Sequence, residues 1–370
     1  MNRPVTEGLL SLIRPEVRSE RAYIVPGARP VSVKLNQNES PFDLPPELKR
    51  QLLEEFFEIS FNRYPSEQPT KLLEALESHC KVEPGSILAG NGSNELTYTI
   101  GMCFVSKGDE VLIPCPTFAL YDSMVRLHGG TPLQVTCRAD HQINTEAIIS
   151  TIRDRQPKLV VLATPNNPTG RAIPLEDIRK IVQAAPGFVV VDEAYHEFNP
   201  EPSALTLQSE FPNVIILRTL SKAFGLAGLR LGYLVARPEV TAQIMKARLP
   251  FMIDRLSEQV ALMLLDNDTL VSERVSTIMN NTRDLATSMR QVPGLEVRST
   301  DTNFVLFKAD SDAAKLLERL ADLDVLVRNM GGYPELKGFL RVTSGTKDEN
   351  KVFLAALTSV VGKKGQSLNS

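Results

Sequence analysis

The chain contains no tryptophan, and four cysteines and four histidines are few for 370 residues. The cysteines show no CxxC spacing, so we expect reduced and mostly buried thiols instead of a disulfide framework. The histidines show no HxxxH or HxH spacing, and we therefore expect no protein metal site.

A strong net charge and long apolar runs are missing as well. The 41 basic and 44 acidic residues leave a net charge of −3 without a basic stripe, which argues against a nucleic-acid partner. No apolar run approaches the ~18 residues of a membrane-spanning helix. The N-terminal sequence, broken by Arg14 and Pro15, lacks the features of a signal peptide. We expect a cytoplasmic protein with neither a nucleic-acid nor a membrane partner.

Up to Pro238, short apolar runs alternate with helical patterns. The runs form the strand candidates SILAGNGS, DEVLIPCP, TPLQVTC, PKLVVLATP, GFVVVDEAY, NVIILRTLS and LGYLVARP. Several of them are apolar on successive residues, which is typical of strands covered on both faces. Helical patterns occur at residues 94–104, 118–127, 145–154 and 175–184. This alternation predicts an α/β fold with a mostly parallel sheet.

The pattern changes after Pro238, where a long helical pattern covers residues 257–290 and mixed strands and helices follow. These segments predict a smaller α/β domain with an antiparallel sheet. The expected parts are an N-terminal arm (1–35), a large domain (36–245), a small domain (246–362) and a disordered tail (363–370).

Polar residues gather where strands of the large domain end, which is where open α/β sheets bind ligands. In AGNGSNEL, Gly92, Ser93 and Asn94 open a helix, and its free N–H groups suit an anion. A turn with a Ser or Asn helix cap explains the same residues. In ATPNNPTG, Asn166 and Asn167 lie beside the expected ligand face, although a proline-rich turn is the alternative.

Charged residues follow two of the apolar strands. Asp192 and Glu193 end the strand of VVVDEAYHEF, where a carboxylate needs a partner or caps a helix. In RTLSKAFGLAGLRLGY, Lys222 has apolar neighbours, and a desolvated amine is easily deprotonated for attack on an aldehyde. Arg230 keeps its charge and suits a phosphate. Amine, carboxylate, arginine and helix N-terminus together match the groups of pyridoxal phosphate.

The motifs NRYP, GNGSNE, PTF, PNNPTG, VDEAY, TLSKAFGLAGLRLGY and LRVTSGT occur in this order along nearly the whole chain. In this the chain resembles pyridoxal-phosphate enzymes of the aspartate-aminotransferase fold, and most closely the histidinol-phosphate aminotransferase family. The resemblance implies a fold-type-I enzyme, with a mostly parallel sheet between helices plus a smaller α/β domain. It also implies a homodimer with shared active sites, to which the N-terminal arm contributes contacts.

The implied reaction transfers an amino group from a small-molecule donor, histidinol phosphate, to a 2-oxo acid acceptor, usually 2-oxoglutarate. Two alternative enzyme functions for the same fold are an aromatic or broad-specificity aminotransferase and a threonine-phosphate decarboxylase. A hypothesis without enzyme activity is a cofactor-binding regulator. This chain keeps Lys222 and starts almost directly with the arm, and both features argue against a regulator.

The resemblance assigns roles to individual residues. Lys222 would bond to the cofactor aldehyde and later move a proton, and Asp192 would pair with the pyridinium nitrogen. Asn167 and Tyr195 would donate hydrogen bonds to the ring 3-oxygen, and Phe118 would stack on the ring. The implied contacts of the cofactor phosphate are Gly92, Ser93, Asn94, Thr219, Ser221, Arg230 and, from the neighbouring subunit, Tyr64.

The implied substrate contacts are Tyr23, Asn167, Arg328 and Arg341. Arg341 would bind the anionic group and Arg328 would assist with a phosphate, unless Arg328 is a surface residue at a strand end.

Two segments depart from the family pattern. The segment AYIVPG has Ala22 before Tyr23, where the family often has Pro-Tyr-x-Pro-Gly. In PFMIDRLSEQ, Asp254 and Arg255 either alter substrate choice or serve as a helix cap and a solvated charge.

Overall fold

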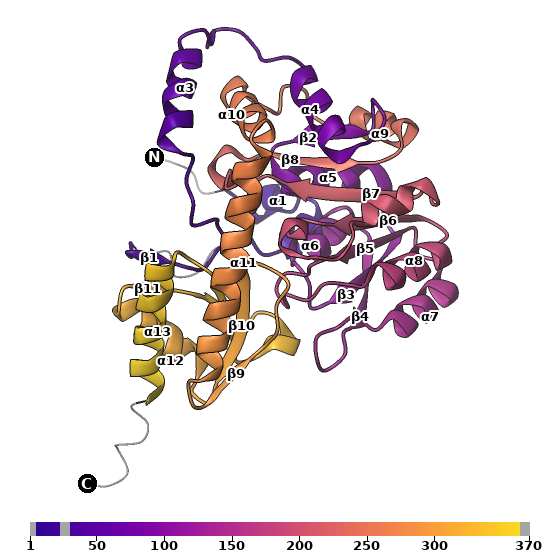
Figure 1. The fold of residues 1–370 in the computed structure, drawn as a ribbon. Coiled ribbons are helices and arrows are strands. Elements are labelled where there is room, and N and C mark those ends of the chain that lie inside the picture. Colours follow the sequence, from indigo (N-terminus) through magenta and orange to yellow (C-terminus); the bar gives the residue numbers. More distant parts are fainter. Residues whose placement is uncertain (1–4, 23–29, 363–370) are drawn as a thin grey trace, which may run out of the picture.

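The computed structural model describes residues 5–22 and 30–362 (Figure 1). Its larger sheet has seven strands in the order β2-β8-β7-β6-β5-β3-β4. Strand β8 is antiparallel to both neighbours, and the other pairs are parallel. The strands are β2 (Ile87–Gly90), β3 (Glu110–Cys115), β4 (Thr131–Thr136), β5 (Leu159–Ala163), β6 (Phe188–Asp192), β7 (Val214–Thr219) and β8 (Gly232–Val235). Each strand lies within a predicted segment.

Helices cover both faces of this sheet. Successive residues of β6 enter different cores, since Val189 and Val191 pack on one side and Val190 packs on the other. The first side holds α4 (Thr70–Cys80), α7 (Thr145–Arg155), α8 (Leu175–Ala184) and α10 (Arg255–Leu265), with α3 (Pro46–Phe56) partly buried against it. The second side holds α5 (Gly92–Phe104), α6 (Leu120–Leu127) and α9 (Pro238–Ile244). The continuous apolar runs are explained by this double coverage.

A second body is built on a four-stranded antiparallel sheet, β12-β13-β10-β9, and on the parallel pair β1-β11. Its strands are β1 (Val33–Lys34), β9 (Leu295–Val297), β10 (Phe304–Ala309), β11 (Val325–Leu326), β12 (Arg328–Asn329) and β13 (Phe339–Thr343). Its helices are α12 (Ala313–Asp322) and α13 (Lys347–Gly362).

Helix α11 (Asp268–Arg290) runs past both bodies in Figure 1. Val271 and Ile278 pack in the core of the large sheet, whereas Leu285 and Met289 pack in the core of the small one. The domain bounds at residues 245 and 362 remain predictions. The packing of α11 in both cores favours a boundary within this helix over one near residue 245.

The sequence predicts one helix over 257–290, whereas the structure has α10 and α11. The chain turns at Asp266 and Asn267, where the Asn267 side chain donates to the Met263 carbonyl oxygen over 2.6 Å. An Asn that bonds to nearby backbone competes with helix continuation.

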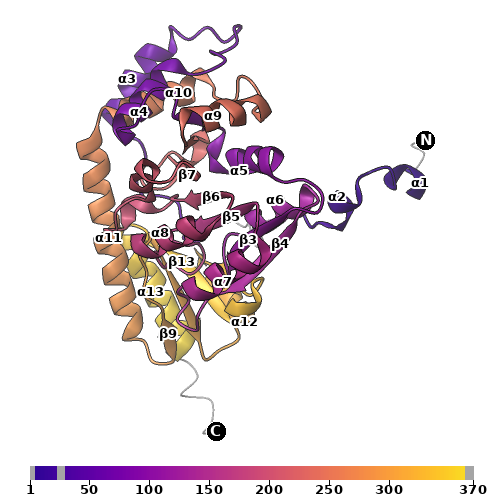
Figure 2. The same cartoon turned by 90° about the vertical axis from the view of Figure 1, so that its right-hand side faces the viewer.

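The N-terminal helices α1 (Glu7–Leu10) and α2 (Pro15–Ser19) project away from the rest of the chain (Figure 2). Glu20 accepts a hydrogen bond from Ser123 of α6 over 3.2 Å. Tyr23 and the predicted tail at 363–370 lie outside the described residues. Within the described ranges, every helix is too short or too polar to cross a membrane.

Candidate active site

A cavity of about 1270 Å³ lies at the carboxyl ends of the parallel strands and is closed on one side by β12 and β13. The predicted site residues that line it are Ser93, Asn94, Phe118, Asn167, Asp192, Tyr195, Thr219, Ser221, Lys222, Arg230, Arg328 and Arg341. The fold thus brings together groups that are up to about 250 positions apart in the chain, in the place where open sheets bind ligands.

Gly92 and Tyr64, the other predicted site residues in the described ranges, do not line the cavity. Gly92 adjoins the lining residue Ser93, whereas Tyr64 lies at the surface. Its side chain is 78% exposed and stacks on Phe251, with ring centroids 4.8 Å apart. The backbone carbonyl of Tyr64 accepts a hydrogen bond from Arg255 over 3.2 Å.

Lys222 follows β7 in the cavity wall. Its Nζ donates to the Gln37 carbonyl oxygen over 3.0 Å and lies 5.9 Å from the ring centroid of Tyr195. Burial, and next the positive charge of Arg341, lower the pKa of the Lys222 ammonium to about 8. The neutral, nucleophilic amine is therefore accessible near neutral pH.

Asp192 is the last residue of β6 and is buried at the cavity wall. Its carboxylate accepts hydrogen bonds from the Tyr121 hydroxyl and, over 3.0 Å, from the Ala194 backbone N–H. Burial raises the pKa of Asp192. Across the described ranges it forms no ion pair, so its charge is suited to a cationic N–H group of a ligand.

Tyr121 was not predicted as a site residue. It lies on α6, three residues after Phe118, and its ring contacts that of Phe118 edge-on at 6.3 Å. Phe118 precedes α6, so the two rings do not share a helix face, and no local sequence signal marks Tyr121 as a partner of Asp192.

Glu193 points away from the cavity into a separate buried network. Its carboxylate accepts from Arg218 over 2.8 and 3.0 Å, from the Ser203 hydroxyl, and from the Ala204 backbone N–H over 2.7 Å. The arginine that opens the RTLSKAF segment is therefore a structural partner of Glu193.

A cluster of donors lies at the start of α5. A Cβ atom on Gly92 would be 2.5 Å from Nη2 of Arg230, and one on Gly232 would be 2.3 Å from the Ser93 nitrogen. Arg230 Nη1 donates to the Ser221 hydroxyl over 3.3 Å. Since glycine alone permits these approaches, the helix N-terminus, Ser221 and Arg230 converge on one place, and this donor set suits a phosphate.

Thr219 holds the turn that carries Ser221 by two hydrogen bonds. Its hydroxyl accepts from the Ser221 backbone N–H over 3.1 Å and donates to the Leu231 carbonyl oxygen over 3.2 Å. The turn that carries Ser221 is thereby fixed.

Arg341 and Arg328 are register partners on β13 and β12. Arg341 donates to the Asn167 side-chain oxygen and, over 3.2 Å, to the Asn36 carbonyl oxygen. Its guanidinium lies 5.1 Å from the ring centroid of Phe304. Like charges directly opposite each other on a sheet repel, so this pair is suited to an anion between them.

Asp254 and Arg255 do not line the cavity. Asp254 caps α10, since its carboxylate accepts from the Ser257 backbone N–H over 2.9 Å and from the Ser257 hydroxyl over 2.6 Å. The helix-cap interpretation of Asp254 is confirmed.

The family model for aminotransferase class I and II matches residues 30–357. The chain belongs to this aminotransferase family. The family resemblance and the aminotransferase class that the sequence predicts are therefore confirmed.

Curated relatives of this chain bear the name histidinol-phosphate aminotransferase. The protein of Chlorobaculum tepidum is 39% identical over 346 residues, covering 94% of this chain and 99% of its own. That of Chlorobium phaeovibrioides is 39% identical over 354 residues, covering 96% and 98%.

Solved aminotransferase structures share the fold. Histidinol-phosphate aminotransferase from Sinorhizobium meliloti, in complex with pyridoxal-5'-phosphate, has a TM-score of 0.86 at 27% identity and covers 95% of this chain and 97% of that one. Aspartate aminotransferase from Thermotoga maritima, at 21% identity, has a TM-score of 0.78 and covers 90% and 92%. The predicted fold-type-I class is confirmed, and family and neighbour together imply pyridoxal phosphate.

Proposed function

We propose that this aminotransferase uses pyridoxal phosphate to move the amino group of histidinol phosphate to 2-oxoglutarate. The observation that carries the proposal is one cavity holding an amine, a buried carboxylate and a phosphate-type donor cluster opposite two paired arginines. The names of the curated relatives favour histidinol phosphate as the amino donor.

The residues present fit pyridoxal phosphate. The buried Asp192 would hold a proton on the pyridine nitrogen, Phe118 would cover the ring, and Asn167 and Tyr195 would donate to its 3-oxygen. The phosphate would lie in the donor cluster, whose members are Gly92, Ser93, Asn94, Thr219, Ser221 and Arg230. When bound, the cofactor supplies an aldehyde for amines and a ring that accepts electrons from the substrate Cα.

Lys222 would serve as the base and acid for the substrate Cα proton. It is a basic group in the cavity wall, and its lowered pKa allows it to take up and release a proton near neutral pH. Arg341 and Arg328 would hold the anionic end of the substrate and so fix the Cα near Lys222.

The deciding assay compares three substrates with purified protein, added pyridoxal phosphate and 2-oxoglutarate as the amino acceptor. We expect glutamate formation from histidinol phosphate to exceed that from phenylalanine, without release of CO₂ from threonine phosphate. Preferred turnover of phenylalanine would point to an aromatic aminotransferase, and CO₂ release would point to a decarboxylase.

A homodimer with shared sites is the second part of the proposal. Exposed apolar side chains form two groups near Tyr64 in the chain. In one, Phe56 contacts Phe57 and Phe61 beside Leu53, and in the other Tyr64 stacks on Phe251 beside Leu249. Surfaces of this kind mark protein contacts, and a second copy would bring Tyr64 to the cofactor phosphate of its partner.

Mixed dimers test this arrangement. Lys222→Ala and Tyr64→Ala chains are each expected to be weakly active alone. If sites are shared, one site of a mixed dimer carries both substitutions and the other carries neither, so mixing restores activity. Mixtures no more active than the sum of the separate variants would contradict shared sites.

A further inference from the structure

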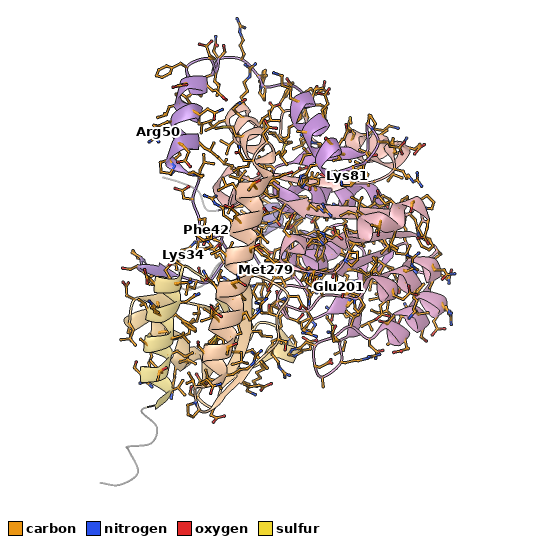
Figure 3. All side chains as sticks on the ribbon, in the orientation of Figure 1. Lys34, Phe42, Arg50, Lys81, Glu201 and Met279 are labelled. Carbon is orange, nitrogen blue, oxygen red and sulfur yellow. The ribbon has the colours of Figure 1, made fainter. Side chains whose placement is uncertain are left out.

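The segment Asn36–Asn38 contacts three residues of the proposed site. The carbonyl oxygen of Asn36 accepts from Arg341 Nη2 over 3.2 Å, and that of Gln37 accepts from Lys222 Nζ over 3.0 Å. These residues lie between Lys34 and Phe42, which Figure 3 labels. No role in the site was predicted for this segment.

Asn38 provides the third contact, because its Nδ2 donates to the Tyr195 hydroxyl oxygen over 2.9 Å. Asn38 is 1% exposed, and its φ of +55° lies in the left-handed region, which asparagine tolerates better than most residues. A buried residue in such a backbone conformation is held there by its surroundings.

Thr343 fixes the orientation of the Asn38 amide. The Thr343 hydroxyl accepts from the Asn38 backbone N–H over 2.9 Å and donates to Asn38 Oδ1 over 3.2 Å. The Asn303 side chain also donates to the Asn38 carbonyl oxygen over 3.2 Å. With its oxygen on Thr343, the amide presents its NH₂ group to Tyr195.

The direction of this hydrogen bond has a chemical consequence. Since the Tyr195 oxygen accepts from Asn38 over 2.9 Å, this contact does not use the phenol proton, which points to a different acceptor than Asn38. We propose that Asn38 is a positioning residue that turns the Tyr195 hydroxyl so that it donates to the anionic ring oxygen of the bound cofactor. This inference rests on the proposed function, because it takes pyridoxal phosphate as the ligand of the cavity.

The test is a pH titration of the visible absorbance of the holoenzyme. A hydrogen bond donated to the anionic ring oxygen of the cofactor favours the deprotonated form of the cofactor. Losing this bond therefore moves the midpoint of the absorbance titration to higher pH. Asn38→Asp keeps the size of the side chain and its tolerance of the left-handed backbone, but presents an acceptor to Tyr195. We expect the midpoint to rise by about one pH unit, the usual scale for a hydrogen bond to a charged group.

The new carboxylate of Asn38→Asp could also shift the midpoint directly, through its charge. Repeating the substitution in a Tyr195→Phe background separates this direct effect from one that acts through the Tyr195 hydroxyl. The ionisable groups around the segment are Lys222, Arg341, Asp192, Arg230, Glu39 and Lys34. Their interaction with a new carboxylate does not need the phenol. If Asn38 acts through Tyr195, Asn38→Asp shifts the midpoint only when the hydroxyl is present, and an equal shift in both backgrounds overturns the proposal.

Two further variants complete the test. Asn144→Asp, at the N-cap of α7 and outside the cavity, is a matched control that should leave the midpoint unchanged. Thr343→Val leaves Asn38 in place but removes its orienting hydroxyl, and it carries the test if Asn38→Asp does not fold. A smaller upward shift is expected, and no shift in any folded variant contradicts the role of Asn38. If the wild type gains no visible absorbance with pyridoxal phosphate, the proposed function fails instead.

Discussion

Two neighbouring carboxylates at the end of β6 have opposite surroundings. Glu193 is enclosed by Arg218, Ser203 and Ala204, all of which donate to it. Asp192 accepts from Tyr121 and Ala194 and faces the cavity. Consecutive residues of a strand point to opposite faces, so one step along the chain separates a group satisfied within the protein from a group suited to a ligand.

Replacing Lys222, on the cavity side, should give the largest effect. Lys222→Ala is expected to lower kcat/KM at least about 10⁴-fold, because it removes both the nucleophile and the proton-transfer group. The thermal midpoint of the apoprotein should not fall. Steady-state rates and thermal scans check this, with the exposed Lys180→Ala as control. Retained activity would remove Lys222 from the mechanism.

Asp192→Asn should lower kcat/KM about 10³-fold, since it removes charge stabilisation from a buried site. Its apoprotein should be at least as stable as the wild type, because the buried charge lacks a protein cation. Rates and urea unfolding are measured beside Asp154→Asn, an exposed control. A loss of stability without loss of activity would reverse the comparison with Glu193.

Glu193→Gln should act on stability. Removing one partner of a buried ion pair leaves Arg218 uncompensated, and the free energy of unfolding should fall by about 3 kcal/mol. The folded enzyme should keep its kcat. Urea unfolding measures the loss, and Glu210→Gln, which breaks a surface pair with Arg179, should cost less than about 1 kcal/mol. A specific loss of kcat would place Glu193 in the active site.

The last effect concerns the pH dependence of stability. The pKa of Lys222 is about 8 in the folded chain against an ordinary value of 10.5, so the unfolded chain binds this proton more tightly. Below pH 8 the buried charge destabilises the fold, and this penalty disappears as pH rises to about 10.5. Apoprotein Lys222→Met should therefore be more stable than wild type at pH 7, and the gap should narrow between these values. A constant gap in urea unfolding would contradict the lowered pKa.

The ends of the strands could be predicted because each apolar run and the polar residues that follow it lie close together in the sequence. Asp192 is the last residue of β6, and Lys222 lies three residues after the end of β7. The sheet and the cavity wall around them follow from the same signal.

Tyr121 and Asn38 could not be predicted in this way. Their hydrogen bonds join residues 71 and 157 positions apart, and no local pattern encodes such contacts. The break between α10 and α11 was missed because Asp266 and Asn267 are weak helix breakers compared with glycine or proline. Asp254 had a local signal, an Asp before an apolar helix, and its cap was among the interpretations.

Helix α11 gives the enzyme a mechanical constraint. This helix of 23 residues packs in both cores. It therefore links the small sheet, which carries Arg328 and Arg341, to the large sheet through one continuous helix. A rigid-body movement of these arginines must pivot about this helix or bend it. Any approach of these arginines to a substrate by such a movement would therefore follow a hinge-like arc.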